Sequence, residues 1–195
     1  MEIITPQPNK EQKIIILLFR DILTIYNSRS ISKIVGITHA GAFKILKRLE
    51  KRGIVQALAI GKAITYSLNF SNPVTHKELE LALVLEAQTL KRWLYELREL
   101  EDKAQCVILF GSIIINEKKA RDVDLLVIAQ KEDMDAIRAI IKRKNEVTRK
   151  KIHLILQSPE DFKSDVTHKN KVMIEIIKKG IVLFGHENIR RYLTR

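Results

Sequence analysis

Apolar positions in the first third of the chain follow the spacing of helices and then that of two strands. The pattern predicts helices over residues 14–26, 31–35 and 38–52, the first of them long and apolar enough to be buried between the others. Strand-like runs follow over 54–60 and 63–69, and in the second apolar and polar residues alternate, as in a half-buried strand. Three helices followed by a hairpin are therefore expected to form one small module.

Residues that begin and end helices lie at the borders of these segments. Ser30 and Thr38 are candidate N-caps for the second and third helices. Gly36 and Gly53 lie where a left-handed residue commonly ends a helix. The two-residue turn Gly61–Lys62 joins the strands.

The third predicted helix has an apolar face and a basic face. The apolar face is made by Ala42, Ile45, Leu46 and Leu49. On the opposite face, positions i, i+3, i+4, i+7 and i+8 are all basic: Lys44, Lys47, Arg48, Lys51 and Arg52.

A long helix is expected after a break at residues 71–73. Thr75 and Glu78 have the spacing of a capping box, and leucines then recur every seven residues to about Asp102. Two interpretations of its apolar face are equally open: packing on one of the domains, or pairing of residues 76–102 with a second copy in a homodimer.

Short apolar runs alternate with helical patterns from residue 105 onward. Strands are predicted over 106–110, 123–129, 152–156 and 181–184, and helices over 133–147, from Pro159 through 172–177, and over 189–193. We therefore predict an α+β protein with two domains, residues 1–72 and 104–195, joined by a connecting helix at residues 73–103.

Charge is unevenly distributed along the 195 residues. The net charge is +12, and residues 1–72 hold eleven Lys/Arg against four Asp/Glu. Such a surface favours a polyanion such as nucleic acid, although a solvated basic face is the alternative. The longest apolar run, residues 14–19, is too short to span a membrane, and no signal peptide is recognisable. The single cysteine, Cys106, fits a cytoplasmic location.

Residues 12–69, and Ser30 to Val55 above all, resemble the winged helix-turn-helix domains of bacterial and archaeal transcription regulators. The resemblance implies double-stranded DNA as the partner, with the third helix in the major groove and commonly a dimer. It would place His39, Gly41 and Lys44 near base edges, with Lys47, Arg48 and Lys51 towards phosphates and Lys62 at the tip of the wing. A winged helix that docks a protein is the alternative.

The stretch most suited to chemistry is Gly111-Ser112 followed by Asp122-Val123-Asp124. Residues i and i+2 of a strand lie on one face, so Asp122 and Asp124 should converge while Val123 enters the core. Two carboxylates so close repel each other unless a cation lies between them. The glycine would let a phosphate approach the backbone, and Ser112 adds two donors. Nearby Lys118, Lys119 and Arg121 could contact a triphosphate or form a solvated loop.

The motif Leu109-Phe-Gly-Ser112, nine further residues and Asp122-Val-Asp-Leu125 resembles the signature of the DNA polymerase β-like nucleotidyltransferases. The likeness spans about residues 104–186, and 178–185 resemble the end of the minimal members. It implies Mg²⁺ or Mn²⁺ on Asp122 and Asp124, a nucleoside triphosphate such as ATP, and attack of an acceptor hydroxyl on the α-phosphorus.

One position departs from that family. Where a third carboxylate is usual on the neighbouring strand, this chain has His153, and no Asp or Glu occurs between Glu146 and Glu160. Histidine can bind a transition metal or act as a base, but it replaces an oxygen ligand of Mg²⁺ poorly. The interpretation that we favour from sequence is an ordinary, partly buried histidine. The sequence therefore leaves open whether the domain is catalytic, and it still predicts binding of a metal ion and a nucleotide.

Three functions are compatible with the sequence. The first is a DNA-binding regulator with a nucleotide-sensing domain. The second is an active nucleotidyltransferase that acts on a protein or a nucleic acid. The third is an antitoxin-like protein that modifies or occludes a toxin partner. The basic N-terminal module favours the first.

Overall fold

The computed structural model describes residues 6–21 and 24–193. The chain is α+β, as predicted, and it divides into two compact units, residues 6–85 and residues 86 onward. No helix in the described ranges is both long and apolar enough to cross a membrane.

The first unit has the winged helix-turn-helix arrangement. Its elements are α1 (Lys10–Arg20), β1 (Tyr26–Asn27), α2 (Ser28–Val35), α3 (His39–Lys51), β2 (Val55–Ile60), β3 (Ala63–Leu68) and α4 (Pro73–Ala87). The three strands form an antiparallel sheet in the order β1-β3-β2. Its core is made by apolar residues with no exposed surface: Ile14, Ile15, Ile31, Ala42, Leu46, Leu49 and Ile54.

The predicted ends of α3 and of the hairpin are confirmed. The Thr38 side chain accepts a hydrogen bond from the Gly41 N–H, and the helix runs to Lys51. Gly36, Gly53 and Gly61 have φ values of +66°, +70° and +59°, which only glycine adopts readily.

The first two predicted helices differ from those observed. α1 ends at Arg20, and Tyr26 lies in β1 opposite Tyr66, although a helix was expected to continue to Tyr26. The phenol of Tyr26 donates to the buried carboxylate of Asp21, which follows the end of α1. Asn27 is the N-cap of α2, and Ser30 completes its capping box from the third helical position.

The long helix expected over 75–102 is interrupted. It begins at Pro73, because proline suits the first turn of a helix, and the Thr75 hydroxyl donates instead to the carbonyl of Ile54. After α4 the chain forms a 3₁₀ turn (Gln88–Leu90), α5 (Lys91–Glu96) and a second 3₁₀ turn (Arg98–Leu100). Thr89 donates its hydroxyl to the Glu86 carbonyl, a local bond that competes with a regular helix.

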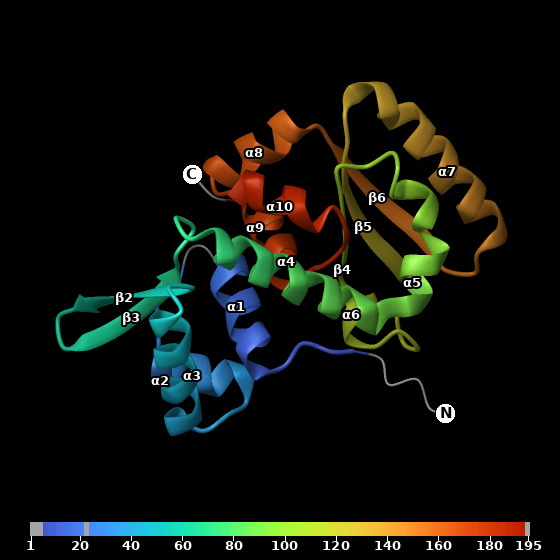
Figure 1. Ribbon diagram of the computed structural model, residues 1–195. Helices are drawn as coiled ribbons and strands as arrows, with labels where there is room; N and C mark the ends of the chain where they lie inside the picture. Colours follow the sequence, from blue (N-terminus) through green and yellow to red (C-terminus); the bar gives the residue numbers. More distant parts are fainter. Residues whose placement is uncertain (1–5, 22–23, 194–195) are drawn as a thin grey trace. The chain divides into compact units, whose positions relative to one another are not determined.

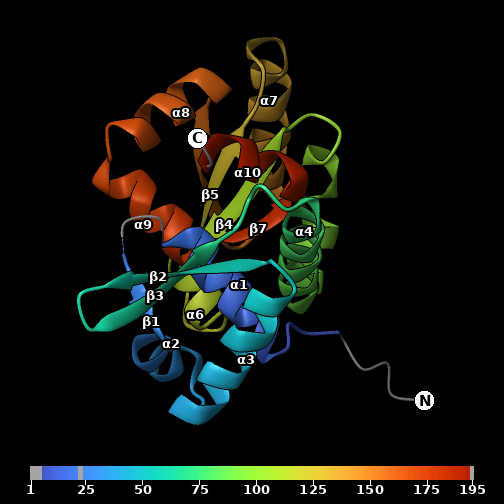
Figure 2. The same cartoon turned by 60° about the vertical axis from the view of Figure 1, so that its left-hand side comes forward.

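The second unit is a four-stranded mixed sheet with helices on both faces (Figures 1 and 2). The strand order is β6-β5-β4-β7; β5 and β6 are parallel, and the other neighbours are antiparallel. The elements after α5 are β4 (Cys106–Phe110), α6 (Ser112–Ile115), β5 (Asp122–Ile128), α7 (Met134–Val147), β6 (Lys151–Gln157), α8 (Pro159–Thr167), α9 (Lys171–Lys179), β7 (Ile181–Phe184) and α10 (His186–Leu193).

Alternate residues of β4 and β5 enter two apolar layers. Val123, Leu125 and Val127 belong to one buried cluster, which also contains Trp93 and Leu97 from α5 and its C-cap and Ile137 and Ile141 from α7. On the other face the helices α8, α9 and α10 cover the sheet, with Phe162 and Ile189 fully or nearly fully buried. The sheet is therefore held rigidly on both sides.

The helical region after Pro159 is two helices, where one continuous region was expected. Lys169 has a φ of +54°, and the side chain of Asn170 accepts hydrogen bonds at the start of α9. Gly180 ends α9 as expected, but its φ is −71°. Glycine is needed there because a Cβ would lie 2.6 Å from both the Ile108 side chain and the Ile176 carbonyl.

Candidate functional site

Two carboxylates and an imidazole meet at the start of β5 and β6. Asp122 and Asp124 lie on one face of β5, and His153 lies opposite Asp124 in the parallel register. The Nδ1 of His153 is 3.7 Å from Asp122 Oδ2 and 3.6 Å from Asp124 Oδ1. One ligand atom from each residue lies within 4.8 Å of the other two. We call these three residues the acidic cluster.

The side chains of the acidic cluster are open to solvent, but the strand that carries the two aspartates is held by buried neighbours. The side chains of Asp122, Asp124 and His153 are 37%, 27% and 62% exposed. Val123 and Leu125, which alternate with the aspartates, are fully buried and hold β5 in place. The interpretation of His153 as a partly buried histidine is therefore wrong, because the ring is exposed and its Nδ1 lies near both carboxylates.

The family comparison matches this part of the chain. Residues 93–189 match the family model described as Polymerase beta, Nucleotidyltransferase. Residues 93–189 form a nucleotidyltransferase domain of this family. It contains β4, the Gly-Ser turn and the acidic cluster. The predicted resemblance is thus confirmed for the second unit.

Other comparisons give weaker or no matches. No curated protein matches the chain. Solved structures that are similar include a C30S mutant of ZitR from Lactococcus lactis, at 13% identity and a TM-score of 0.37, covering 75% of this chain and 78% of that one. Another is the Adhesin competence repressor AdcR from Streptococcus pyogenes, at 12% identity and a TM-score of 0.37, covering 73% and 83%. At these scores neither structure bears on the function of this chain.

Gly111 of the nucleotidyltransferase domain makes room for Asp124. Phe110 lies opposite Asp124 in the antiparallel register of β4 and β5, so the turn after Phe110 passes the carboxylate. Gly111 has a φ of +79°, and a Cβ there would lie 2.0 Å from Asp124 Oδ2. The sequence analysis assigned this glycine to phosphate approach. In the structure its immediate role is to let Asp124 take its position.

Alanine at position 111 tests this role. Gly111→Ala should lower the melting temperature, because a non-glycine residue at this φ costs of the order of 1–3 kcal/mol. It should also weaken Mn²⁺ binding by about tenfold or more, because the methyl group displaces Asp124. Gly185→Ala is the matched control: its φ is +75° and its Cβ would lie 1.9 Å from the Gln105 carbonyl, at the opposite end of β4.

Calorimetry and thermal melts distinguish the two glycine variants. Both should be less stable than the wild type, and only Gly111→Ala should lose metal affinity. Equal Mn²⁺ affinity in the two folded variants would contradict the role of Gly111 in placing Asp124.

Ser112 and the basic residues of the following loop are the other predicted phosphate contacts. Ser112 is exposed and begins α6, where its carbonyl accepts the Asn116 N–H at 3.0 Å. Lys118, Lys119 and Arg121 are exposed, and their side chains make no ion pair with any described residue. The structure does not bring these three cations to the carboxylates.

The donor set of the acidic cluster suits a divalent transition metal. Carboxylate oxygens bind both Mg²⁺ and Mn²⁺, whereas an imidazole nitrogen favours transition metals over Mg²⁺. A site made of Asp122, Asp124 and His153 should therefore distinguish Mn²⁺ from Mg²⁺ better than an all-oxygen site would. Of the two predicted ions, Mn²⁺ is the transition metal, and it also accepts the carboxylate oxygens.

In the first unit, the basic residues of α3 are of two kinds. Lys44 and Lys51 are exposed and make no ion pair among the described residues, and Lys47 pairs with Glu50 at 2.8 Å on its own helix. The hydrogen bond to Glu50 raises the pKa of Lys47, which therefore stays charged. These three lysines form the lysine face of α3.

Arg48 and Arg52 are held by acidic residues of other helices. The Arg48 Nε donates to Glu11 Oε2 at 2.8 Å, and Arg52 bridges Glu11 and Glu78. Arg48 was predicted to face phosphates, and Arg52 was placed on the same basic face. Sequence analysis missed Glu11 and Glu78, because they lie 37 and 26 positions from the arginines that they bind and no local pattern indicates the pairing.

Two of the remaining predicted DNA contacts, His39 and Gly41, also have a structural role. The ring Nε2 of His39 is 2.9 Å from the Ser28 hydroxyl, a contact between α3 and α2. A Cβ at Gly41 would lie 3.0 Å from the capping oxygen of Thr38, so the glycine leaves room for the cap. Lys62 is exposed in the turn between β2 and β3. His39 and Lys62 remain accessible to a partner.

Proposed function

We propose that the protein is a DNA-binding regulator whose nucleotidyltransferase domain binds a divalent metal ion and a nucleoside triphosphate at Asp122, Asp124 and His153. The observation that carries the proposal is the convergence of three metal-ligating atoms within 4.8 Å on the domain of this family. The first unit supplies the DNA-binding part.

Each residue of the acidic cluster has a role in this proposal. Asp122 and Asp124 provide anionic oxygens, and His153 provides a neutral nitrogen donor. A bound divalent ion would neutralise phosphate charge and orient the triphosphate. Gly111 keeps Asp124 in line, and the exposed Ser112 offers a hydroxyl and an N–H to a phosphate at the same turn.

DNA binding rests on the shape and charge of the winged helix unit. The lysine face of α3 presents Lys44, Lys47 and Lys51 to solvent, and Lys62 extends the charge to the tip of the wing. In this fold the third helix is the one that enters a major groove. Arg48 is proposed to orient α3 through Glu11, with DNA phosphates as its second partner.

Calorimetry with the full-length protein tests the metal–nucleotide site. ATP should bind in the presence of Mn²⁺, and the Mn²⁺-dependent part of the heat should disappear when EDTA removes the ion. Equal ATP binding with and without EDTA, or no binding in Mn²⁺, would contradict the proposal for the acidic cluster.

The second candidate function is active nucleotidyl transfer, which the position of His153 favours. Its Nδ1 lies as close to the two carboxylates as a third ligand would, so the site holds three groups where the family usually places three carboxylates. Incubation with triphosphates labelled at the α-phosphate, Mn²⁺ and protein or nucleic-acid acceptors decides between the candidates. A labelled acceptor that Asp124→Asn does not form would establish transfer, and nucleotide binding without product would identify a sensor.

The antitoxin-like role, the homodimer through residues 76–102 and the cytoplasmic location stay predictions.

A further inference from the structure

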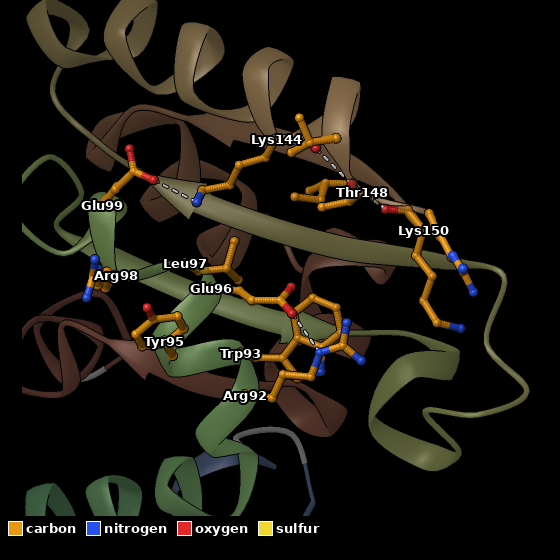
Figure 3. Close-up of a pocket in the computed structure, with 13 residues that line it drawn as sticks. Arg92, Trp93, Tyr95, Glu96, Leu97, Arg98, Glu99, Lys144, Thr148 and Lys150 are labelled. Atoms are coloured by element: carbon orange, nitrogen blue, oxygen red, sulfur yellow. Dashed lines mark hydrogen bonds and ion pairs between the residues drawn. The ribbon is translucent and has the colours of Figure 1, made fainter.

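A cavity of about 640 Å³ lies in the nucleotidyltransferase domain on the side of the sheet that carries α5 and α7 (Figure 3). It is lined by α5, the 3₁₀ turn that follows it, the C-terminal end of α7, the loop to β6 and the first apolar residue of β6. The acidic cluster lies on the opposite face of the sheet, because Ile152 pairs with Val123 whereas His153 pairs with Asp124. The cavity is therefore separate from the metal site.

The inner wall of the cavity is apolar and includes an unpaired donor. Trp93, Leu97 and Ile152 line it and are 3%, 0% and 6% exposed. The indole Nε1–H of Trp93 is buried and has no hydrogen-bond partner among the described residues. Buried donors in folded proteins are nearly always paired, so this N–H is a place for an acceptor that residues 6–21 and 24–193 do not supply.

The outer wall is cationic. Five basic residues line the cavity against two carboxylates, and Arg98, Arg149 and Lys150 make no ion pair among the described residues. The two carboxylates are already engaged: Glu96 with Arg92 at 2.6 Å, and Glu99 with Lys144 at 2.7 Å. The hydrogen bond from Lys144 lowers the pKa of Glu99, which therefore stays charged at neutral pH. The remaining positive charge is uncompensated.

Two guanidinium groups stack on aromatic rings along α5 and the 3₁₀ turn that follows it. The guanidinium of Arg92 is 5.0 Å from the centroid of the Trp93 ring, and that of Arg98 is 4.7 Å from the Tyr95 ring. Figure 3 shows Arg92, Trp93, Tyr95 and Arg98 along one side of the cavity, with Lys144, Thr148 and Lys150 on the other. Such planes accept an aromatic ring, and the unpaired cations accept a phosphate.

We propose that this cavity is a second ligand site, for a small molecule that joins a planar ring to a phosphate, of the nucleoside monophosphate class. The volume lies within the range of small-molecule pockets. The ring would pack on the exposed guanidinium plane of Arg92, and the phosphate would bind Arg149 and Lys150, which are neighbours in the loop to β6. The site requires no metal ion and is independent of the acidic cluster.

Trp93 is the only tryptophan of the chain, so its fluorescence reports directly on the cavity. The full-length protein is titrated with AMP in EDTA, which removes metal-dependent binding at the acidic cluster. A saturable fluorescence change is expected. Adenosine and ribose 5-phosphate should each bind at least about tenfold more weakly than AMP, because each makes only one of the two interactions.

Variants assign the binding to the cavity. Arg149→Ala with Lys150→Ala should weaken AMP binding by about tenfold or more, because both changes remove charged contacts to phosphate. Lys163→Ala with Lys171→Ala, which removes two exposed cations of the same domain from outside the cavity, should leave it unchanged. Asp122→Asn with Asp124→Asn should also leave it unchanged.

Three results would overturn the proposal. One is the absence of AMP binding up to about 5 mM, by fluorescence and by ligand-observed NMR together. Another is AMP binding that survives Arg149→Ala with Lys150→Ala. The third is AMP binding that is lost in Asp122→Asn with Asp124→Asn, which would place the nucleotide at the acidic cluster.

Discussion

Asp122→Asn together with Asp124→Asn is expected to abolish binding of Mn²⁺ and of Mn²⁺-ATP while the fold remains intact. Asparagine keeps the size of the side chain, and both residues are partly exposed, so the change removes two negative ligand atoms and little packing. A site left with one imidazole and two neutral amides binds a divalent ion poorly. We expect the calorimetric heat of Mn²⁺ binding to fall below detection.

The matched control replaces two exposed carboxylates of the same domain outside the acidic cluster, Glu132→Gln with Asp135→Asn. It changes the net charge equally and should leave Mn²⁺-ATP binding within about twofold of the wild type. ATP binding that is equal in the two variants would show that the nucleotide sits elsewhere. Melting temperatures of both variants should confirm that they are folded.

Reversing the charge of the lysine face, with Lys44→Glu, Lys47→Glu and Lys51→Glu together, should abolish binding of duplex DNA in gel retardation. All three side chains are exposed, so the fold should persist. Each lost phosphate contact reduces the slope of log K against log salt concentration by about one unit. The three changes together should lower the affinity at least about a hundredfold. Arg48 is left unchanged because it binds Glu11.

The control for the DNA experiment is Lys10→Glu, Lys13→Glu and Lys77→Glu, three exposed lysines of α1 and α4 in the same unit. Its charge change is identical, and it should retain most of the DNA affinity. An equal loss in the two triple variants would mean that only overall charge matters. Undiminished binding by the α3 variant would contradict the assignment of α3 to the major groove.

Local patterns were sufficient to predict the strands of the second unit, the hairpin of the first and the common face of Asp122 and Asp124. The side chains of a strand alternate with period two, so the two carboxylates share a face whatever the strand pairs with. The caps of α3 are equally local, since Thr38 and Gly53 act on their own helix.

Features that depend on pairing between distant segments could not be predicted. The orientation of His153 depends on the parallel register of β5 and β6, and the need for glycine at position 111 depends on the register of β4 and β5. The ion pairs of Arg48 and Arg52 join separate helices. The cavity beside Trp93 is built from α5 and the end of α7, about fifty residues apart in the sequence.

The true starts of α4 and α2 do have local signals in the sequence. Pro73 marks the first turn of α4 better than Thr75 does, because proline lacks the N–H that the first turn leaves free. Asn27 precedes Ser30 with the spacing of a capping box and is the true N-cap of α2.

The central claim is that Asp122, Asp124 and His153 together hold one metal ion. Pulsed EPR of the full-length protein with Mn²⁺ and inorganic triphosphate, which contains no nitrogen, tests it most directly. The wild type should show a nitrogen coupling from the imidazole of His153, and His153→Asp should still bind Mn²⁺ but lose that coupling. No nitrogen coupling in the wild type, or a coupling that persists in His153→Asp, would contradict the claim.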